Sequence, residues 1–249
     1  MKTLEHFDLL SFLENINRTT NIEDAFKIFT NACLFVGFEY VVYSLITPHD
    51  SIGYKAGHAI VGNYPSDWMA YYRQKNYEKI DPVIKHIKQK EGIFCWNDLA
   101  KYNLLKNPKE KTLMLQADEA GLHNGVGLSF KNYYGEIVGM GLASSCKNLD
   151  ITSSKLNFIS IIAKQFDTVF KNLALKQKNN HLPEYTLTER QKEILFWIAK
   201  DKKYGEIADI LNISENTVLY HIKEIFKRLQ VNSQIAAILT AIKFGLITP

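Results

Sequence analysis

Apolar residues follow two different spacings along the chain, and each spacing predicts one kind of element. Runs rich in β-branched and aromatic residues predict four strands, over 37–47, 54–62, 124–132 and 136–145. The last two would form a hairpin around Tyr134 and Gly135. Where apolar residues recur every three or four positions, helices are expected from Asn21, over 65–75, and from Asp150 or Thr152 to about 177.

The pattern changes after a polar stretch that contains Pro183, and we interpret this stretch as a linker over 176–186. Only helical spacing follows it, with helices expected over 188–200, 204–211, 215–229 and 233–245. The predicted fold class is therefore α+β. Residues 1–175 would form an α-β-α sandwich with an antiparallel sheet, and residues 187–249 an all-α helix-turn-helix domain of four helices.

Composition and charge narrow the classes of function only slightly. The chain of 249 residues is 46% hydrophobic and 22% charged, as in an ordinary folded protein, and its net charge of +4 permits nucleic-acid binding without requiring it. Because residues 181–249 hold nine basic and eight acidic residues, any DNA contact must depend on where the charges lie. No apolar run is long enough to span a membrane, and the N-terminus does not resemble a signal peptide. Three cysteines without CxxC spacing indicate a cytoplasmic protein: Cys33, Cys95 and Cys146.

Residues 204–229 have the pattern of a helix-turn-helix. Asn212 and Ile213 would form the connection, and Ser214 is placed to cap the second helix. That second helix has one apolar face for a core, and its other face presents Asn216, Leu219, Tyr220, Lys223 and Lys227. Such a helix can enter a major groove, where lysines reach phosphates or guanine edges.

The stretch 187–247 closely resembles the DNA-binding domain of LuxR-type regulators through its LT-x-R, EIA-x-x-L, IS-x-x-TV-x-x-H and A-x-x-x-GLI segments. It departs from that pattern at Gln191, where an acid is usual, and at Asp201, where a glycine is usual. The resemblance implies base contacts from Leu219, Tyr220 and Lys223. It implies phosphate contacts from Thr217 and Lys227, with Lys203 or Tyr204 as further candidates.

Four aromatic residues and one acid gather between positions 64 and 96: Tyr64, Trp68, Tyr72, Asp81 and Trp96. Trp68 and Tyr72 are four positions apart, so they share one face of a helix. Such rings can enclose an apolar cavity and still donate to a carbonyl, while a lone carboxylate can accept an amide N–H. These groups would suit an uncharged amide with an alkyl tail. Alternatively the rings belong to a core, and Asp81, which precedes a proline, is a helix cap.

The spacing W-x3-Y-x8-DP-x13-W, followed by Gly121 and Gly125, resembles the autoinducer-binding domain of the same LuxR-type family. In that family the pocket holds an N-acyl-homoserine lactone. The resemblance implies that Trp68 donates to the lactone carbonyl, that Asp81 accepts the ligand amide N–H, and that Tyr64 binds the acyl carbonyl.

The resemblance also implies packing roles for Tyr72 and Trp96 against the lactone ring and the acyl chain. Ser144, on the last predicted strand, is a further candidate for the acyl carbonyl. The family often has a proline just after the glycine segment, whereas this chain has Leu-Ser-Phe at 128–130. The acyl chain length is therefore not predicted.

The implied protein is a transcription factor that binds an autoinducer and, as a homodimer, a palindromic site on double-stranded DNA. Ligand binding would be coupled to folding, since a ligand that binds only the ordered state stabilises it. The long helix before the linker offers a dimer surface made of Phe166, Phe170 and Leu173. The last helix has an apolar stripe to divide between its own core and a dimer contact: Ile235, Ile238, Leu239 and Ile242.

Other classes of protein have less support in the sequence. The segment Pro48-His49-Asp50 is a poor match to a phosphate receiver, and there is no P-loop. The chain has no GxSxG, and His58, His86 and His123 lack metal-ligand spacing, so we expect no catalytic residue, no metal and no cofactor. Three alternatives stay open: a regulator of the same build that takes another ligand or none, a lactone or amide hydrolase, and an interaction module that does not bind DNA.

Overall fold

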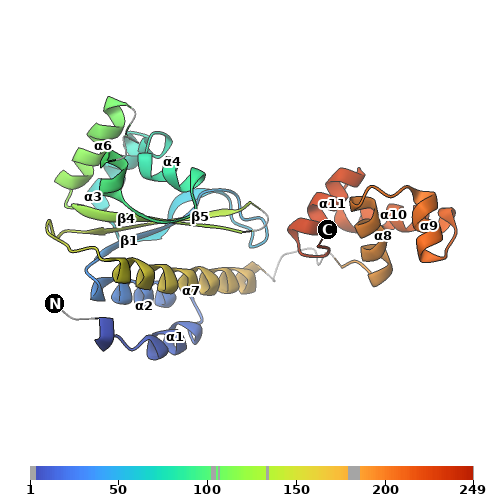
Figure 1. Cartoon of the computed structure of the whole chain (residues 1–249), viewed down its shortest axis with the longest axis horizontal. Helices are drawn as coiled ribbons and strands as arrows, with labels where there is room; N and C mark the ends of the chain where they lie inside the picture. Colours follow the sequence, from blue (N-terminus) through green and yellow to red (C-terminus); the bar gives the residue numbers. More distant parts are fainter. Residues whose placement is uncertain (1–3, 102–104, 106, 133–134, 179–185, 249) are drawn as a thin grey trace. The chain divides into compact units, whose positions relative to one another are not determined.

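The computed structural model describes residues 4–101, 105, 107–132, 135–178 and 186–248 (Figure 1). Contacts divide the chain into two compact units, residues 1–180 and residues 181–249. Each unit has a hydrophobic core of its own. Tyr134 of the predicted hairpin turn and residues 179–185 of the predicted linker, which include Pro183, lie outside the described residues.

A five-stranded antiparallel sheet forms the centre of the first unit. Its strands are β1 (Tyr40–Leu45), β2 (Gly57–Gly62), β3 (Gly92–Cys95), β4 (Asn124–Lys131) and β5 (Ile137–Ser144). They pair in the order β2-β1-β5-β4-β3. The four strands predicted from the sequence are confirmed, and β3 is an additional short edge strand. Its four residues are too few to show a clear alternation of apolar and polar side chains in the sequence.

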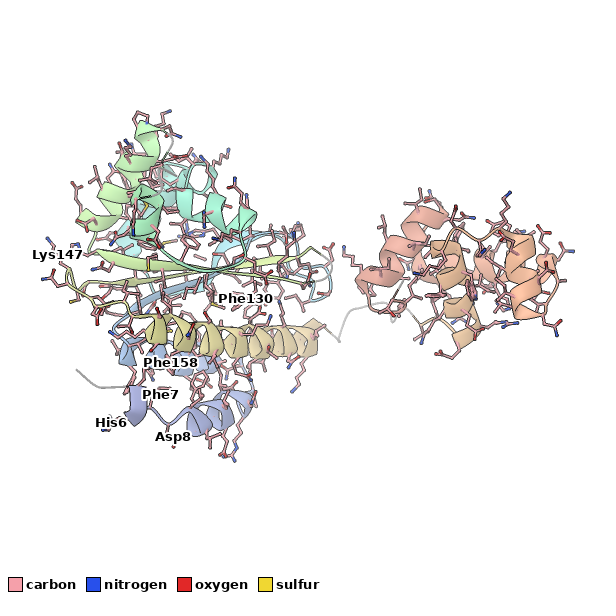
Figure 2. All side chains as sticks on the ribbon, viewed as in Figure 1. His6, Phe7, Asp8, Phe130, Lys147 and Phe158 are labelled. Carbon is pink, nitrogen blue, oxygen red and sulfur yellow. The ribbon has the colours of Figure 1, made fainter. Side chains whose placement is uncertain are left out.

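Two long helices cover one face of this sheet, α2 (Ile22–Phe35) and α7 (Ser153–Lys178), and they pack side by side (Figure 1). Helix α1 (Leu9–Asn17) packs on both of them, and the short 3-10 helix η1 (Leu4–His6) precedes it. Phe7, between η1 and α1, contacts Phe158 of α7 edge to face, with ring centroids 4.7 Å apart (Figure 2). The N-terminal segment is thus fixed to α7 by aromatic packing.

The face of α7 that was expected to form a dimer surface lies inside the first unit. Phe166 and Phe170 are fully buried, and Leu173 is 4% exposed. Phe166 stacks on Phe29 of α2, with centroids 4.7 Å apart and the rings inclined by 9°. The prediction that these three residues contact a second copy is therefore wrong, because the sheet and α2 already cover them.

Shorter helices cover the other face of the sheet, where Figure 1 shows α3, α4 and α6. They are α3 (Ser66–Gln74), the 3-10 turn η2 (Tyr77–Lys79), α4 (Pro82–Gln89), α5 (Trp96–Lys101) and α6 (Pro108–Glu119). A capping box between Asn107 and Glu110 starts α6. With helices on both faces of an antiparallel sheet, the predicted α-β-α sandwich is confirmed.

The second unit contains α8 (Glu189–Ala199), α9 (Tyr204–Leu211), α10 (Glu215–Leu229) and α11 (Gln234–Lys243). These four helices were all predicted, and α9 and α10 have the predicted bounds.

Gln191 and Asp201, the two departures from the LuxR-type pattern, both suit their local structure. Gln191 completes a capping box with Thr188, which a neutral amide can do as well as an acid. Asp201 adopts the left-handed conformation that explains the usual glycine, with φ of 60°.

Candidate functional site

A cavity lies between the sheet and the helices α3, α4 and α6. Five of the six predicted ligand-binding residues line it: Tyr64, Trp68, Tyr72, Asp81 and Trp96. Trp68 and Tyr72 come from one face of α3, with ring centroids 5.9 Å apart, as their spacing predicts. The fold therefore brings one acid and four aromatic rings around a single cavity.

Glycines on the sheet make room for the rings beside this cavity. A Cβ atom at Gly125 of β4 would lie 2.2 Å from the indole of Trp96, and one at Gly141 of β5 would lie 2.8 Å from the hydroxyl of Tyr64. Both distances are shorter than real Cβ contacts, so a larger residue would displace the ring. The two glycines are therefore required by close approach of the aromatic rings.

Asp81 both caps a helix and lines the cavity. Its Oδ1 accepts hydrogen bonds from the backbone N–H of Val83 at 2.7 Å and of Ile84 at 3.4 Å, which fixes the start of α4. Its Oδ2 accepts from the hydroxyl of Tyr72 at 2.7 Å. Burial raises the pKa of Asp81, and these hydrogen bonds act in the opposite direction. The carboxylate still has lone pairs for a further donor.

Two polar atoms at the cavity have no hydrogen-bond partner among the described residues, the hydroxyl of Tyr64 and Nε1 of Trp96. A buried donor without a partner typically costs about 1–3 kcal/mol. Burial, and then the charge of Asp81, raise the pKa of Tyr64, so its hydroxyl keeps its proton. The cavity thus offers two unpaired donors and one carboxylate acceptor within apolar walls, which suits a neutral ligand with carbonyl oxygens and an N–H group.

Ser144 does not belong to this site. Side chains alternate along β5, and Gly139 and Gly141 line the cavity, so Ser144 lies on the opposite face with Met140 and Leu142. Its Oγ accepts from the backbone N–H of Cys146 at 3.2 Å. The expectation that Ser144 binds an acyl carbonyl is therefore corrected.

The serine that does line the cavity is Ser44 of β1, and beside it lies His58 of β2. The Oγ of Ser44 is 3.1 Å from Nδ1 of His58, whose imidazole stacks on the ring of Tyr72 with centroids 5.0 Å apart. Neither was predicted as a site residue, and His58 was expected to be an ordinary core or surface histidine. The alternation of the predicted strand 37–47 gives two possible faces for Ser44, and nothing local in the sequence selects one.

The second unit presents the predicted DNA-binding face on α10. Asn216, Tyr220, Lys223 and Lys227 are exposed, and Leu219 is half-buried. Thr217 is half-buried too, and its hydroxyl hydrogen bonds with that of Ser214 at 2.8 Å. Neither lysine forms an ion pair with a described residue. The buried stripe of α10 faces the core with Val218, Ile222, Ile225 and Leu229.

Helix α11 divides its apolar residues between the core and the surface. Ala237 and Ala241 are fully buried, Ile238 and Ile242 pack partly against the core, and Ile235 and Leu239 are 72% and 62% exposed. The last pair is four positions apart, so it forms one continuous exposed apolar patch on the helix. An exposed patch of this kind is available to a partner.

No group of three or more His, Cys, Asp or Glu side chains in the described ranges could hold a metal ion. The cysteines are all free. In the part of the chain that the structure describes, no helix is long and apolar enough to cross a membrane.

Comparison with known proteins agrees with this division of the chain. Residues 21–166 match the family described as an autoinducer binding domain, and residues 185–241 match the bacterial regulatory proteins of the luxR family. The regulatory protein SdiA of Escherichia coli (strain K12) is 31% identical over 215 residues, which cover 84% of this chain and 85% of SdiA. The transcriptional activator protein AnoR of Acinetobacter nosocomialis is 27% identical over 229 residues, 91% of this chain and 93% of AnoR.

A solved structure shares the fold over nearly the whole chain. SdiA in complex with octanoyl-rac-glycerol superimposes with a TM-score of 0.68 at 25% identity, covering 99% of this chain and 98% of that one. The relatives named here are regulatory proteins and not enzymes.

Proposed function

Because the chain belongs to the LuxR family of bacterial regulatory proteins, we propose that it senses an N-acyl-homoserine lactone and regulates transcription by binding DNA as a dimer. It is a DNA-binding transcriptional regulator with an autoinducer-binding domain, not an enzyme. In this proposal residues 1–175 bind the ligand and contribute to dimerisation, 176–186 act as a linker, and 187–249 bind DNA. The protein would act in the cytoplasm, where bacterial DNA lies.

The observation that carries the proposal is the set of unpaired polar atoms at the cavity. The hydroxyl of Tyr64 and Nε1 of Trp96 are buried donors, and Asp81 is a buried acceptor with capacity to spare. An N-acyl-homoserine lactone carries two carbonyl oxygens and one amide N–H on an apolar frame, so its amide could pair with Asp81 and a carbonyl with Tyr64 while its chain stays among apolar side chains.

The proposed roles follow the groups at the cavity. Asp81 accepts the amide N–H, Tyr64 donates to the acyl carbonyl, and Trp68 donates to the lactone carbonyl. Tyr72 and Trp96 pack against the lactone ring and the start of the chain. The hydrogen bond from Tyr72 holds Asp81 in place for its contact. A ligand that binds only the ordered state would stabilise it by about 4 kcal/mol at a thousandfold excess over Kd.

The second unit would read DNA through α10. Leu219, Tyr220 and Lys223 contact bases, while Thr217 and Lys227 contact phosphates. Two copies would pair through the exposed patch of Ile235 and Leu239 on α11, which could replace the dimer surface expected of Phe166, Phe170 and Leu173. A symmetric pair of such domains would bind a palindrome whose half-sites are about 10 base pairs apart.

A second candidate ligand has one specific observation in its favour. The similar protein SdiA has been solved in complex with octanoyl-rac-glycerol, which has an acyl chain but no lactone. The same cavity in this chain could therefore hold an acylated glycerol, whose hydroxyls and ester carbonyl would occupy the polar end. The two candidates differ in the donor that they offer to Asp81, which is an amide N–H in the lactone and a hydroxyl in the acylated glycerol.

The test for the ligand is calorimetric titration of the full chain with N-octanoyl-homoserine lactone and with octanoyl-glycerol. Asp81→Asn replaces an acceptor oxygen by an N–H₂ group and is expected to weaken lactone binding by about 10–100-fold, since a hydrogen bond to a charged group is lost. Asp118→Asn, at a 53% exposed carboxylate, is the matched control and should bind as the wild type does. Mass spectrometry should recover the lactone intact, whereas a hydrolysed lactone would contradict the proposal.

The test for DNA binding is a gel shift with a palindromic operator. Lys223→Ala and Lys227→Ala should each weaken binding, and Lys223→Ala should also relax sequence preference because it is assigned to a base. Lys192→Ala on α8, where the lysine pairs with Glu189, is the control that keeps wild-type affinity. Leu239→Asp should give a monomer in analytical ultracentrifugation and weaken the complex with the full palindrome. Full-strength binding by such a monomer would refute the dimer.

A further inference from the structure

His58 is the one imidazole that lines the cavity among the described residues. It is half-buried, and its ring lies flat against Tyr72, with centroids 5.0 Å apart and an inclination of 27°. The proposed ligand contacts leave it without a role. A histidine in an apolar wall is a marked departure from the other lining residues of the sheet, which are Val42, Gly139, Met140 and Gly141 beside Ser44.

The backbone around His58 is distorted in a way that positions it. Ala59, the next residue, has φ of 49°, a left-handed conformation that is unfavourable for alanine in a strand. The register between β1 and β2 shifts at the same place, between Tyr43 and Leu45. The backbone N–H of Ala59 donates to the side-chain Oγ of Ser44 at 3.0 Å. Ser44 therefore holds the irregular segment that carries His58.

The contacts of Ser44 suit one tautomer of the imidazole. Its Oγ already accepts from Ala59 and lies 3.1 Å from Nδ1 of His58. The proton of this buried hydroxyl has no other acceptor among the described residues, so we assign it to Nδ1, which can accept it only when the imidazole proton is on Nε2. Burial lowers the pKa of His58, which favours this neutral form. Nε2–H is then a hydrogen-bond donor with no partner among the described residues.

The position of His58 relative to Asp81 indicates which part of a ligand the imidazole would contact. The hydroxyl of Tyr72 binds Asp81, and the ring of the same tyrosine stacks on His58. The imidazole therefore lies one aromatic ring away from the carboxylate that accepts the amide N–H. In an N-acyl-homoserine lactone the next polar position along the chain from the amide and its carbonyl is the third acyl carbon, which bears either hydrogens or an oxygen.

We propose that His58 is a specificity-determining contact whose Nε2–H donates to an oxygen on the third acyl carbon, so that the protein prefers 3-oxo or 3-hydroxy acyl chains to unsubstituted chains. This inference rests on the proposed lactone function. The reason for the preference is that an unsubstituted chain would place methylene groups against the donor and leave it unpaired, whereas an oxygen pairs it.

The test is calorimetric titration of the full chain with three ligands of equal length: N-octanoyl-, N-(3-oxooctanoyl)- and N-(3-hydroxyoctanoyl)-homoserine lactone. The wild type should bind one or both of the oxygen-bearing ligands about tenfold more tightly than the unsubstituted one. His58→Phe keeps a ring against Tyr72 and removes the donor, so the affinities should converge to within about twofold. The loss should come from the oxygen-bearing ligands alone.

Two further variants separate a ligand contact from a structural role. His58→Gln carries an amide N–H and should recover part of the preference. His86→Phe is the matched control, because His86 contacts Phe94 edge to face outside the cavity lining, and it should keep the wild-type preference.

Several results would overturn the inference. His58 and Tyr72 also line an outer hollow beside Arg73 and Glu78. If Nε2–H serves that hollow instead, the wild type will bind all three lactones equally. A preference that survives in His58→Phe would also overturn the inference and leave the lactone function standing. If none of the three lactones binds the wild type, the proposed function fails first and the inference fails with it.

Discussion

The central sheet presents large side chains to α2 and α7 on one face and glycines to α3 and α4 on the other. Along β5, Met140 and Leu142 point into the first core, while Gly139 and Gly141 border the cavity. Helix α7 fills the first face with Phe166 and Phe170, which are fully buried. One strand thus supports a close-packed core on one side and leaves space on the other.

The two faces also treat their buried polar groups differently. On the α7 face, the hydroxyl of Tyr43 donates to Asp167 at 2.9 Å, and Lys171 pairs with the same carboxylate at 3.0 Å. At the cavity, Tyr64 and Trp96 have donors without partners among the described residues. Tyr43 and Asp167 are thus satisfied within the fold, whereas the unpaired donors at the cavity are available to a ligand. This contrast supports assigning stability to the first face and ligand binding to the second.

The largest effect is expected from breaking the close-packed face. Phe166→Ala should lower the free energy of unfolding by about 3–5 kcal/mol, because it leaves a void among stacked rings. Urea unfolding with and without N-octanoyl-homoserine lactone measures this loss. Since the cavity lies on the other face, the difference between variant and wild type should be the same in both conditions. A difference that grows with ligand would show that the two faces are coupled.

Filling the open face should have an intermediate effect of a different kind. Gly125→Ala places a methyl group in the indole of Trp96 and should lower stability by about 1–3 kcal/mol. The displaced indole should also weaken ligand binding by about tenfold, a loss of roughly 1.4 kcal/mol. The deficit in stability should therefore be larger with ligand than without it. Gly205→Ala on α9, where the added methyl group meets only ordinary contacts, is the control that keeps ligand affinity.

The smallest effect separates two tyrosines that each donate to a buried aspartate. Tyr43→Phe and Tyr72→Phe should each cost about 1 kcal/mol of stability, because Lys171 still pairs with Asp167 and Val83 still donates to Asp81. Only Tyr72→Phe should change ligand affinity, since it frees the carboxylate that accepts the amide N–H. Thermal unfolding and calorimetry compare the two variants directly. Equal effects on ligand binding would remove the distinction between the faces.

Local signals in the sequence were sufficient for most elements. Ser214 caps α10 by accepting from the N–H of Thr217, and the buried stripe of α10 has the predicted spacing. The helix-turn-helix could be predicted because caps, stripes and turns depend on residues within a few positions of one another. The convergence of Trp68, Tyr72 and Asp81 was also predictable in part, since two of them share one helix face.

Other features had no local signal. The apolar stripe of α7 predicts that Phe166 and Phe170 are buried, but it does not say whether a second copy or the chain's own sheet buries them. The sheet does. On α11 the sequence also left open which apolar residues face the core and which face a partner. In the structure the small Ala237 and Ala241 face the core, while Ile235 and Leu239 are exposed. Hydrophobic burial is non-directional, so a stripe predicts that contact occurs and leaves the partner open.

The sequence by itself determined four of the five strands, the helices α2, α3 and α7, the helix-turn-helix domain and the aromatic and acidic residues around positions 64–96. Only the tertiary structure decided which polar residues join them. Ser144 pairs with Asn124 in the ladder and lies away from the cavity, while Ser44 faces it and reaches His58 across a distorted strand. The physical reason is that side chains alternate along a strand, so a register different by one residue moves every side chain to the other face. Register is set by pairing between distant strands, and no local pattern contains it.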